Sequence, residues 1–294
     1  MRTLLLAPLF AFGLASTANA QNPDPVIPTI EVGSIDIRPH GWTWTTIGTD
    51  REDELLSMAR LRVTVETETP FDAFVEFDVT RGLDGDQNWL RQAYVTYTPS
   101  ENVTVRAGRL FLAAPMVTPP PFLLRTADYM RTPFSAFAWG VQIQARVGDG
   151  VNLVADVTAN SRSRFNESKS FNGIESSGRL TYDVNERLQV GGTYQVSGDF
   201  QRFAGDVTWR PTERHLLNAA VYKTFGDRPV TGGFAFYSYR VGNGVEPHVQ
   251  LDYQHGAEDP FLATVGVRFN HDRFQLIGDV TSRGEILARF QVRF

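Results

Sequence analysis

The chain has 294 residues and a formal net charge of −5, from 28 basic and 33 acidic residues, and it contains no cysteine. The absence of cysteine excludes a disulfide scaffold and any metal site built on thiolates. Acidic and basic residues are interspersed along the chain, so the composition indicates no nucleic-acid-binding face.

Residues 1–20 have the pattern of a secretory signal peptide. Arg2 precedes a short apolar run from Leu4 to Leu14, and small residues follow, ending at Ala20. The run is too short to cross a membrane as a helix, and the Ala-x-Ala ending predicts cleavage after Ala20. Residues 21–29 contain three prolines and predict a short periplasmic lead-in.

Residues 30–294 alternate apolar and polar side chains with the two-residue period of β-strands, which predicts one all-β domain. In residues 59–66, for example, alanine, leucine and valines alternate with arginines, threonine and glutamate. The phase is imperfect in 30–46 and 231–240, so twelve or fourteen strands are alternatives to sixteen. The sixteen predicted strands are 30–46, 56–67, 71–81, 90–98, 103–111, 137–147, 151–159, 175–184, 187–197, 200–210, 214–224, 231–240, 247–255, 260–269, 272–281 and 285–294.

The connections between these segments fall into two classes. Turns follow the even-numbered segments, whereas longer links often follow the odd-numbered ones. Short turns at one end and long loops at the other are typical of a transmembrane, antiparallel up-and-down β-barrel. An even strand count also places both chain ends on the short-turn side. A soluble β-sandwich is the alternative, but it predicts no such alternation of connections.

The last predicted strand, 285–294, has one apolar face and one largely charged face. Its ending in Phe294 resembles the carboxy-terminal assembly signal of bacterial outer-membrane β-barrels. We expect this strand to close the barrel against residues 30–46.

The polar phase of the strands predicts a charged interior. A hydrated channel explains such a lining, because basic side chains that face lipid at mid-depth cost roughly 2–4 kcal/mol each. The alternative is a narrow barrel plugged by its own salt bridges. The predicted inward residues include Arg60, Arg62, Arg106, Arg289, Arg293, Asp72, Glu76 and Asp78.

The longest link, 112–136, follows the fifth predicted strand and is rich in proline and apolar residues. An apolar, proline-stiffened loop is poorly suited to project into water. We expect this third external loop to fold into the barrel as a constriction. A surface plug or a subunit-contact loop is the alternative.

The segments 90–99 and 103–111, followed by Ala114 and Pro115, resemble the porins of Gram-negative outer membranes. The resemblance is nearest to the group that contains the phosphate-selective porins. It implies a sixteen-stranded, trimeric channel in which bases near an inward-folded loop attract anions. By position, the bases that the resemblance assigns to this role are Arg106, Arg109, Arg125 and Arg131.

Two departures bear on the solute. The long loop sets only Asp128 against its arginines, and the chain has almost no lysine, so a lysine-rich phosphate site is not expected. Arg109 follows Gly108 and is out of phase with Arg106, which predicts a bulge or a kink at Gly108. We therefore expect weak anion preference or little selectivity.

Asp84, Asp86 and Asn88 have the alternate-oxygen spacing of a calcium loop. Trp89 replaces the glycine that such a loop requires, and Val95 occupies the place of its bidentate glutamate. A solvated acidic loop is therefore the preferred interpretation, and we predict no metal site.

Together these features predict a passive channel for small hydrophilic solutes or ions in the bacterial outer membrane, with no catalytic residues and no cofactor. Expected partners are outer-membrane lipid and lipopolysaccharide, the barrel assembly machinery and two further copies in a homotrimer. An outer-membrane barrel enzyme of the phospholipase or protease type is one alternative. However, the five histidines have unlike sequence neighbours, and the chain contains neither a Gly-x-Ser-x-Gly nor a His-x-Ser-Asn motif. A structural or adhesive barrel is the other alternative.

Overall fold

The computed structural model describes residues 27–48, 56–79, 90–111, 137–159, 174–197, 200–226, 229–242, 244–255 and 260–293. Strands dominate these segments, as the alternation predicts. No helix among these residues is long and apolar enough to cross a membrane. The strands are β1 Ile30–Val32, β2 Ile35–Gly48, β3 Leu56–Thr67, β4 Phe71–Asp78, β5 Leu90–Ser100, β6 Val103–Phe111, β7 Phe137–Arg146, β8 Val151–Ala159, β9 Ile174–Asn185, β10 Leu188–Ser197, β11 Phe200–Trp209, β12 His215–Phe225, β13 Thr231–Tyr239, β14 Val245–His255, β15 Phe261–His271, β16 Phe274–Thr281 and β17 Ile286–Arg293.

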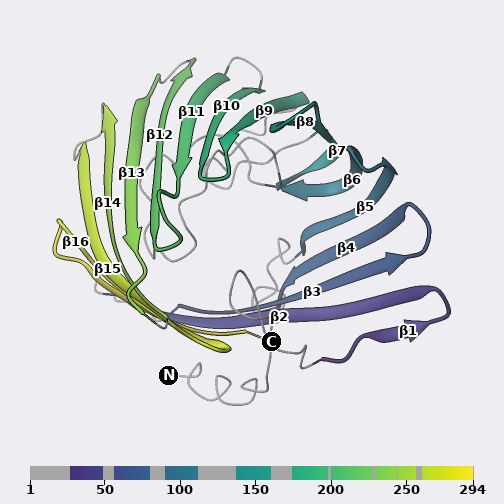
Figure 1. Cartoon of the computed structure of the whole chain (residues 1–294), viewed down its shortest axis with the longest axis horizontal. Coiled ribbons are helices and arrows are strands. Elements are labelled where there is room, and N and C mark those ends of the chain that lie inside the picture. The colour runs from purple at the N-terminus through teal and green to yellow at the C-terminus, as the bar shows by residue number, and fades with distance from the viewer. Residues whose placement is uncertain are drawn as a thin grey trace.

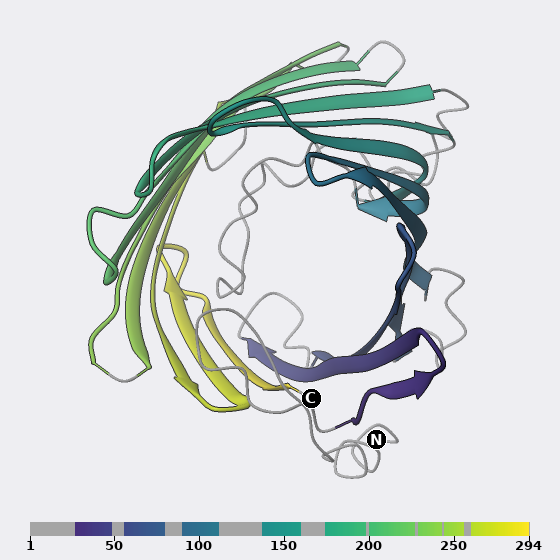
Figure 2. The same ribbon diagram turned by 45° about the vertical axis from the view of Figure 1, so that its right-hand side comes forward.

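Strands β2 to β17 form one closed antiparallel barrel. Each strand pairs with its neighbours in chain order, and β17 pairs with β2 from Leu287 opposite Gly48 to Arg293 opposite Trp42. The last strands, in yellow, therefore meet the first long strand, in purple (Figures 1 and 2). The predicted all-β, up-and-down barrel of sixteen strands is confirmed, and the alternatives of twelve or fourteen strands are wrong.

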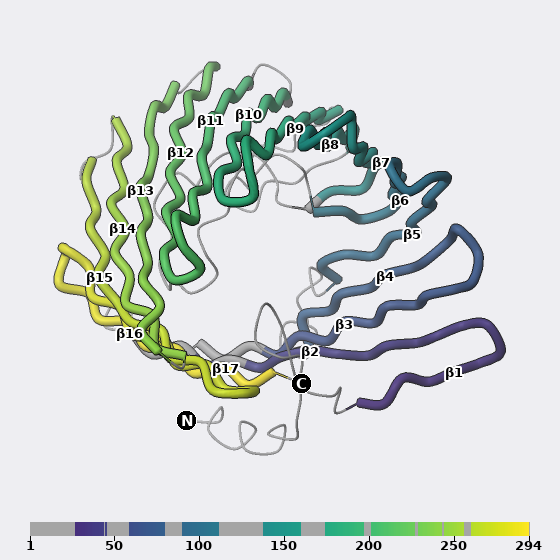
Figure 3. Tube along the Cα trace, viewed as in Figure 1, coloured from purple at the N-terminus to yellow at the C-terminus, as the bar shows by residue number. Residues whose placement is uncertain are grey.

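The first predicted strand is wrong at its start. Residues 30–46 form two strands, because the chain reverses at Gly33, which has a left-handed φ of 64°. Ile30, Glu31 and Val32 fold back on the beginning of β2, with Val32 opposite Ile35. Glycine adopts this conformation without the steric cost of a side chain. β1 is thus a short hairpin arm on β2 (Figure 3), and the barrel wall begins at β2.

The short turns that follow β3, β5, β9 and β15 gather at one end of the barrel, because the strands run alternately up and down. In the turn between β3 and β4, the Thr67 hydroxyl donates to the Phe71 carbonyl at 2.6 Å. The Asp72 carboxylate accepts from the Thr67 amide at 3.1 Å. Side-chain bonds of this type are what stabilise a tight turn between strands.

Burial across the barrel wall is the reverse of that in a water-soluble protein. Alternate positions carry exposed apolar side chains, such as Val221 at 68% and Val265 at 60%. The intervening positions carry buried polar ones, such as Gln250 at 0% and Asp279 at 1%. In a closed barrel one set of alternate positions must face inward. The buried set, which is mostly polar, is therefore the one that faces inward, and the exposed, mostly apolar set faces outward.

Candidate functional site

The inner faces of β3 and β4 bring together four of the predicted lumen residues. Arg60 lies opposite Asp78, and Arg62 lies opposite Glu76. Directly opposite residues on one face of an antiparallel pair have Cβ atoms about 4.5–5.5 Å apart. The two pairs therefore form one continuous charged surface on the barrel wall.

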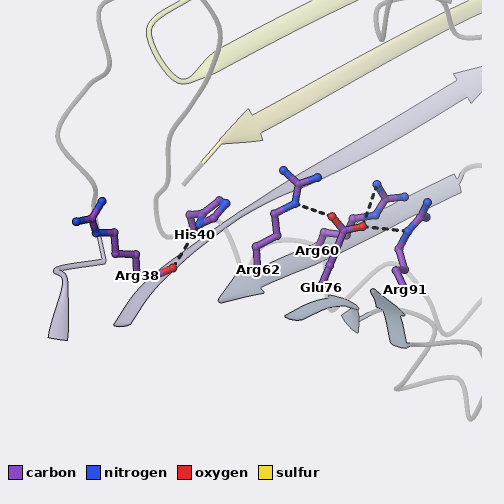
Figure 4. Close-up of polar contacts among 6 residues, drawn as sticks. All are labelled: Arg38, His40, Arg60, Arg62, Glu76 and Arg91. Carbon is purple, nitrogen blue, oxygen red and sulfur yellow. Dashed lines mark hydrogen bonds and ion pairs between the residues drawn. The ribbon is translucent and has the colours of Figure 1, made fainter. Parts of the chain in front are cut away.

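Glu76 lies at the centre of this surface and contacts three guanidinium groups (Figure 4). Its Oε2 lies 2.5 Å from Arg62 Nε, and its Oε1 lies 3.1 Å from Arg91 Nε and 3.9 Å from Arg60 Nη1. The Glu76 side chain is 2% exposed, whereas that of Arg62 is 33% exposed. Three guanidinium groups thus share one carboxylate, and Asp78, opposite Arg60, is a second carboxylate on the same surface. We call Arg60, Arg62, Arg91 and Glu76 the arginine cluster.

Arg91 reaches the arginine cluster because of a β-bulge in β5. Glu76 lies opposite Gln92, whereas Phe77 lies opposite Leu90, so Arg91 is an extra residue in the ladder. A bulge can re-aim a side chain in this way. Strict alternation from Ala93 would place Arg91 on the outer face, which explains why the sequence pattern did not identify it. The sequence did contain one sign of this placement, because Arg91 is an arginine at a position where the alternation of β5 otherwise has apolar side chains.

Aromatic rings hold the arginines against the wall. Arg62 Cζ lies 4.2 Å from the ring centroid of Trp42 and 5.8 Å from that of Phe74. On the next strands, Arg106 Cζ lies 5.3 Å from the Tyr94 ring. These are cation–π distances, and the interaction is strongest where water is partly excluded. The aromatic rings limit the positions that the guanidinium groups can adopt.

On β9 to β11, an ion pair spans a glycine. Arg179 on β9 donates two hydrogen bonds to Asp206 on β11, at 2.5 and 2.8 Å. Gly191 lies on the strand between them, and a Cβ there would come within 2.7 Å of Asp206 Oδ1 and 2.6 Å of Arg179 Nη2. The lack of a side chain at Gly191 is what lets the pair form.

The same arrangement recurs on β14 to β16. His248, Gly266 and Asp279 are in register on three adjacent strands. His248 Nε2 lies 2.8 Å from Asp279 Oδ1 across the glycine, and both side chains are fully buried. Beside them, Arg268 donates to Glu246, which also accepts from the Ser238 hydroxyl at 2.7 Å. Several ionisable groups on this wall are therefore paired by short cross-strand contacts.

The remaining predicted residues take different positions. Arg293 lies opposite Trp42, and Arg289 lies opposite Thr46, on the strand pair that closes the barrel. Arg106 lies on the inner face, directly opposite Thr96 on β5. Tyr94 lies on the same face of β5, two residues before Thr96. Asp72 belongs to the turn end of β4 rather than to the arginine cluster.

Arg109 lies on the outer face. It is in register with Ala93 on β5 and with Trp139 on β7, which is 53% exposed. The ladders on both sides run through Gly108 without a register shift, so the first of the two predicted irregularities, a bulge, is wrong. Gly108 instead has a φ of 139° within an uninterrupted ladder, and the alternation simply places Arg109 outward.

Several predicted features lie outside the described residues. They are the signal peptide 1–20, most of the lead-in 21–29, the loop 112–136 with Arg125, Asp128 and Arg131, the acidic loop with Asp84, Asp86 and Asn88, and Phe294. Within the described segments, no three His, Asp or Glu side chains are grouped as metal ligands.

Comparison with known proteins identifies the class of fold. No protein-family model matches the chain, and no curated protein matches it. Its fold is similar to that of general bacterial porins. A variant of the Rh. blastica porin has a TM-score of 0.65 and 16% identity over 88% of this chain and 99% of that one. The Salmonella typhi OmpF structure, a complex with daunomycin, has a TM-score of 0.67 and 12% identity over 91% of this chain and 100% of that one. A triple variant of the Rhodopseudomonas blastica porin has a TM-score of 0.61 and 17% identity, over 88% of this chain and 99% of that one.

Proposed function

We propose that this protein is an outer-membrane porin whose barrel encloses a water-filled channel for passive diffusion of small hydrophilic solutes. One observation carries the proposal: in the described parts of β2 to β17, every carboxylate occupies the inner face and none occupies the outer face. An outer surface without acids suits lipid, and a charged inner surface suits water. These carboxylates are Asp36, Glu66, Asp72, Glu76, Asp78, Asp156, Glu175, Asp183, Asp206, Glu246, Asp252 and Asp279.

The width of the barrel also supports a channel. Side chains alone fill an interior of about eight strands, whereas barrels of about sixteen strands leave an aqueous lumen. The described ion pairs on β9 to β16 join strands one or two positions apart along the wall. They do not cross the barrel, which disfavours the alternative of a narrow barrel plugged by salt bridges.

A weak anion preference is the finer part of the proposal. It is supported by the arginine cluster, where three guanidinium groups share the Glu76 carboxylate and the Arg62 side chain is 33% exposed. Arg106, Arg289 and Arg293 on neighbouring strands extend the basic surface. A charged lining of one sign raises the local concentration of counter-ions.

We further propose that the loop 112–136 folds inward, with Arg125, Asp128 and Arg131 near the constriction. Support comes from the wall that flanks this loop. Leu110 and Ala138 occupy inner-face positions where β6 ends and β7 begins, yet they are only 1% and 3% exposed. Apolar side chains at the inner face of a wide barrel are expected to be covered rather than wet.

The remaining proposals follow from export and membrane insertion. Residues 1–20 direct the chain across the inner membrane, residues 21–29 are a periplasmic lead-in, and 30–294 fold with the barrel assembly machinery. The mature protein is a homotrimer surrounded by outer-membrane lipid. The alternating burial of the wall and the fold shared with porins support this location.

An enzyme is the second candidate, because Ser238, His248 and Asp279 lie in one inner-face row. A serine nucleophile requires a hydrogen bond to its histidine base. Here the Ser238 hydroxyl donates to Glu246 at 2.7 Å, and all three residues are at most 4% exposed. This geometry supports a structural network, and we do not propose hydrolysis.

Single-channel recording in a planar bilayer tests the proposal. The purified protein should give discrete, long-lived conductance steps. In a KCl gradient, the reversal potential should indicate a mild preference for chloride. A silent bilayer would overturn the channel, and a strong preference for potassium would overturn the selectivity while leaving the channel intact.

A further inference from the structure

His40 is the accessible histidine of the inner face. All five histidines lie in described strands. His248 is inward but fully buried against Asp279. His40 is also inward, because it lies directly opposite Arg62 of the arginine cluster, and it is only half-buried. The remaining histidines point outward, and they are His215, His255 and His271. His40 is therefore the lumen side chain whose charge can change near neutral pH.

One long hydrogen bond holds the His40 ring. Its Nδ1 lies 3.4 Å from the carbonyl oxygen of Arg38, two residues back on β2 (Figure 4). Among the described residues, the ring makes no ion pair and no other hydrogen bond. In the neutral ring the Nδ1–H group can donate to that carbonyl, so Nε2 is the nitrogen that takes up a proton. Proton uptake at Nε2 therefore requires no contact to be broken.

The charged residues that face His40 across the wall are mainly cationic. Arg62 lies directly opposite on β3, and Glu76, which three guanidinium groups share, lies beyond it on β4. On the other edge of β2, β17 ends at Arg293, opposite Trp42. The other charged side chains at this level are Arg60, Arg91 and Asp78. A proton on His40 therefore adds positive charge directly opposite a cation.

Toward the short-turn end, Arg38 holds the nearest carboxylates. Its Nη2 lies 3.1 Å from Asp36 Oδ2 and 3.0 Å from Glu66 Oε2. Asp36 and Glu66 are opposite each other, one row beyond Arg38, and Glu31 on β1 lies opposite Asp36 in the same row. None of these carboxylates is in register with His40, so an imidazolium there acts on the lumen beside Arg62.

We propose that His40 makes the anion preference of the channel depend on pH. Protonation of its imidazole adds a unit positive charge to the wall beside Arg62, so the preference for anions increases as the pH falls. This role deepens the proposed function and rests on it. The neutral and protonated forms share every other charge of the lumen, including those outside the described residues, so the sign of the change follows from the added proton. A unit charge about 10 Å from a passing ion in water corresponds to about a twofold change in the permeability ratio.

Reversal potentials of the full-length protein in a planar bilayer with a KCl gradient test the role of His40. They are compared at about pH 8, where an imidazole is neutral, and at about pH 5, where it is protonated. Between these values, the preference of the wild type for chloride over potassium should rise by about twofold more than that of His40→Gln. The change that remains in His40→Gln comes from carboxylates, which begin to take up protons at the lower pH. At about pH 8 the two proteins should have the same reversal potential, because an imidazole and an amide are both uncharged.

Two further variants separate charge from structure. His40→Arg carries a fixed positive charge, so at about pH 8 it should prefer chloride by about twofold more than the wild type. Its change between the two pH values should match that of His40→Gln. The matched control is His271→Gln, which removes an exposed outward imidazole at the short-turn end of β15. This control should keep the pH dependence of the wild type.

Heat-modifiable electrophoretic mobility identifies preparations that are folded. A silent bilayer from folded wild-type protein would overturn the channel, and the role of His40 with it. A conducting wild type whose pH dependence equals that of His40→Gln would overturn the role of His40 and leave the channel intact. An unchanged preference in His40→Arg at the higher pH, or a loss of pH dependence in His271→Gln, would also overturn the role of His40 alone.

Discussion

Glu76 shows how one carboxylate controls a basic surface. It is almost fully buried and shared by Arg60, Arg62 and Arg91, so none of these guanidinium groups has a carboxylate to itself within the cluster. Glu76 is therefore the carboxylate that offsets the positive charge of all three guanidinium groups at once. Removing the carboxylate should therefore change ion preference more than channel size.

Glu76→Gln should increase the preference for chloride over potassium by about twofold. A unit charge about 10 Å from a passing ion in water contributes roughly 0.4 kcal/mol, which corresponds to that factor. The glutamine keeps the side-chain shape, so conductance in symmetric salt should change little. The measurement is the reversal potential across a planar bilayer with a KCl gradient.

The control for this change is Asp183→Asn, which removes the same charge from the inner face of β9. Asp183 accepts from Gln189 at 2.6 Å and has no arginine within salt-bridge distance among the described residues. Its effect on reversal potential should be smaller. A shift of Glu76→Gln toward potassium, or equal shifts in the two variants, would contradict the role of the arginine cluster.

At the level of elements, glycines on the middle strand permit contacts between polar side chains of the strands on either side. Gly266 separates His248 from Asp279, and a Cβ there would lie 2.0 Å from Asp279 Oδ1 and 2.6 Å from His248 Nε2. Gly266→Val should therefore break the pair and leave two buried polar groups poorly satisfied. The expected loss is about 1–3 kcal/mol in the free energy of unfolding.

Urea titration of the barrel, followed by heat-modifiable mobility, measures this loss. Gly278→Val provides a matched control on the adjacent strand, because a Cβ at Gly278 meets nothing within 4 Å. The control should unfold at nearly the wild-type urea concentration. Equal midpoints for Gly266→Val and the wild type would show that the ion pair tolerates a side chain between its partners.

The outer face of β7 gives a direct test of membrane insertion. Val141 lies near the middle of β7 and is 46% exposed, whereas Gln144 lies on the inner face. Val141→Arg should destabilise the folded barrel in lipid vesicles by roughly 2–4 kcal/mol, because it places a charge against hydrocarbon. Gln144→Arg should have a much smaller effect, because it faces the lumen. Equal unfolding free energies of the two variants in vesicles would contradict a lipid-facing outer surface.

The strand pattern could be predicted because each strand faces two different solvents. That requirement imposes a strict two-residue period, which the sequence displays openly. Local departures from the period could not be predicted. The reversal at Gly33 and the extra residue Arg91 each depend on the pairing of neighbouring strands. Conversely, Gly108 suggested a bulge that the ladder does not contain, since glycine permits an unusual φ without disturbing the register.

At the level of the whole molecule, closure explains why an even number of strands could be predicted, although it does not distinguish sixteen from fourteen or twelve. An up-and-down barrel with both ends on one side needs an even number of strands, and the pairing of β17 with β2 meets this condition.

The arginine cluster was less predictable as a site. Arg60, Arg62 and Glu76 followed from the alternation, but their convergence on one carboxylate depends on strand stagger, which the sequence does not display.

The closing strand pair should make Phe294, the residue after β17, important for assembly. β17 pairs with β2 as far as Arg293 opposite Trp42, so Phe294 immediately follows the seam that completes the barrel. Deletion of Phe294 should reduce the folded, heat-modifiable protein in the outer membrane, while export across the inner membrane continues. The control is Phe274→Ala, which removes an exposed outward ring from the same end of the neighbouring strand but leaves the terminus intact. Unchanged outer-membrane levels after deletion, with normal folding, would show that closure between β17 and β2 does not depend on a terminal aromatic residue.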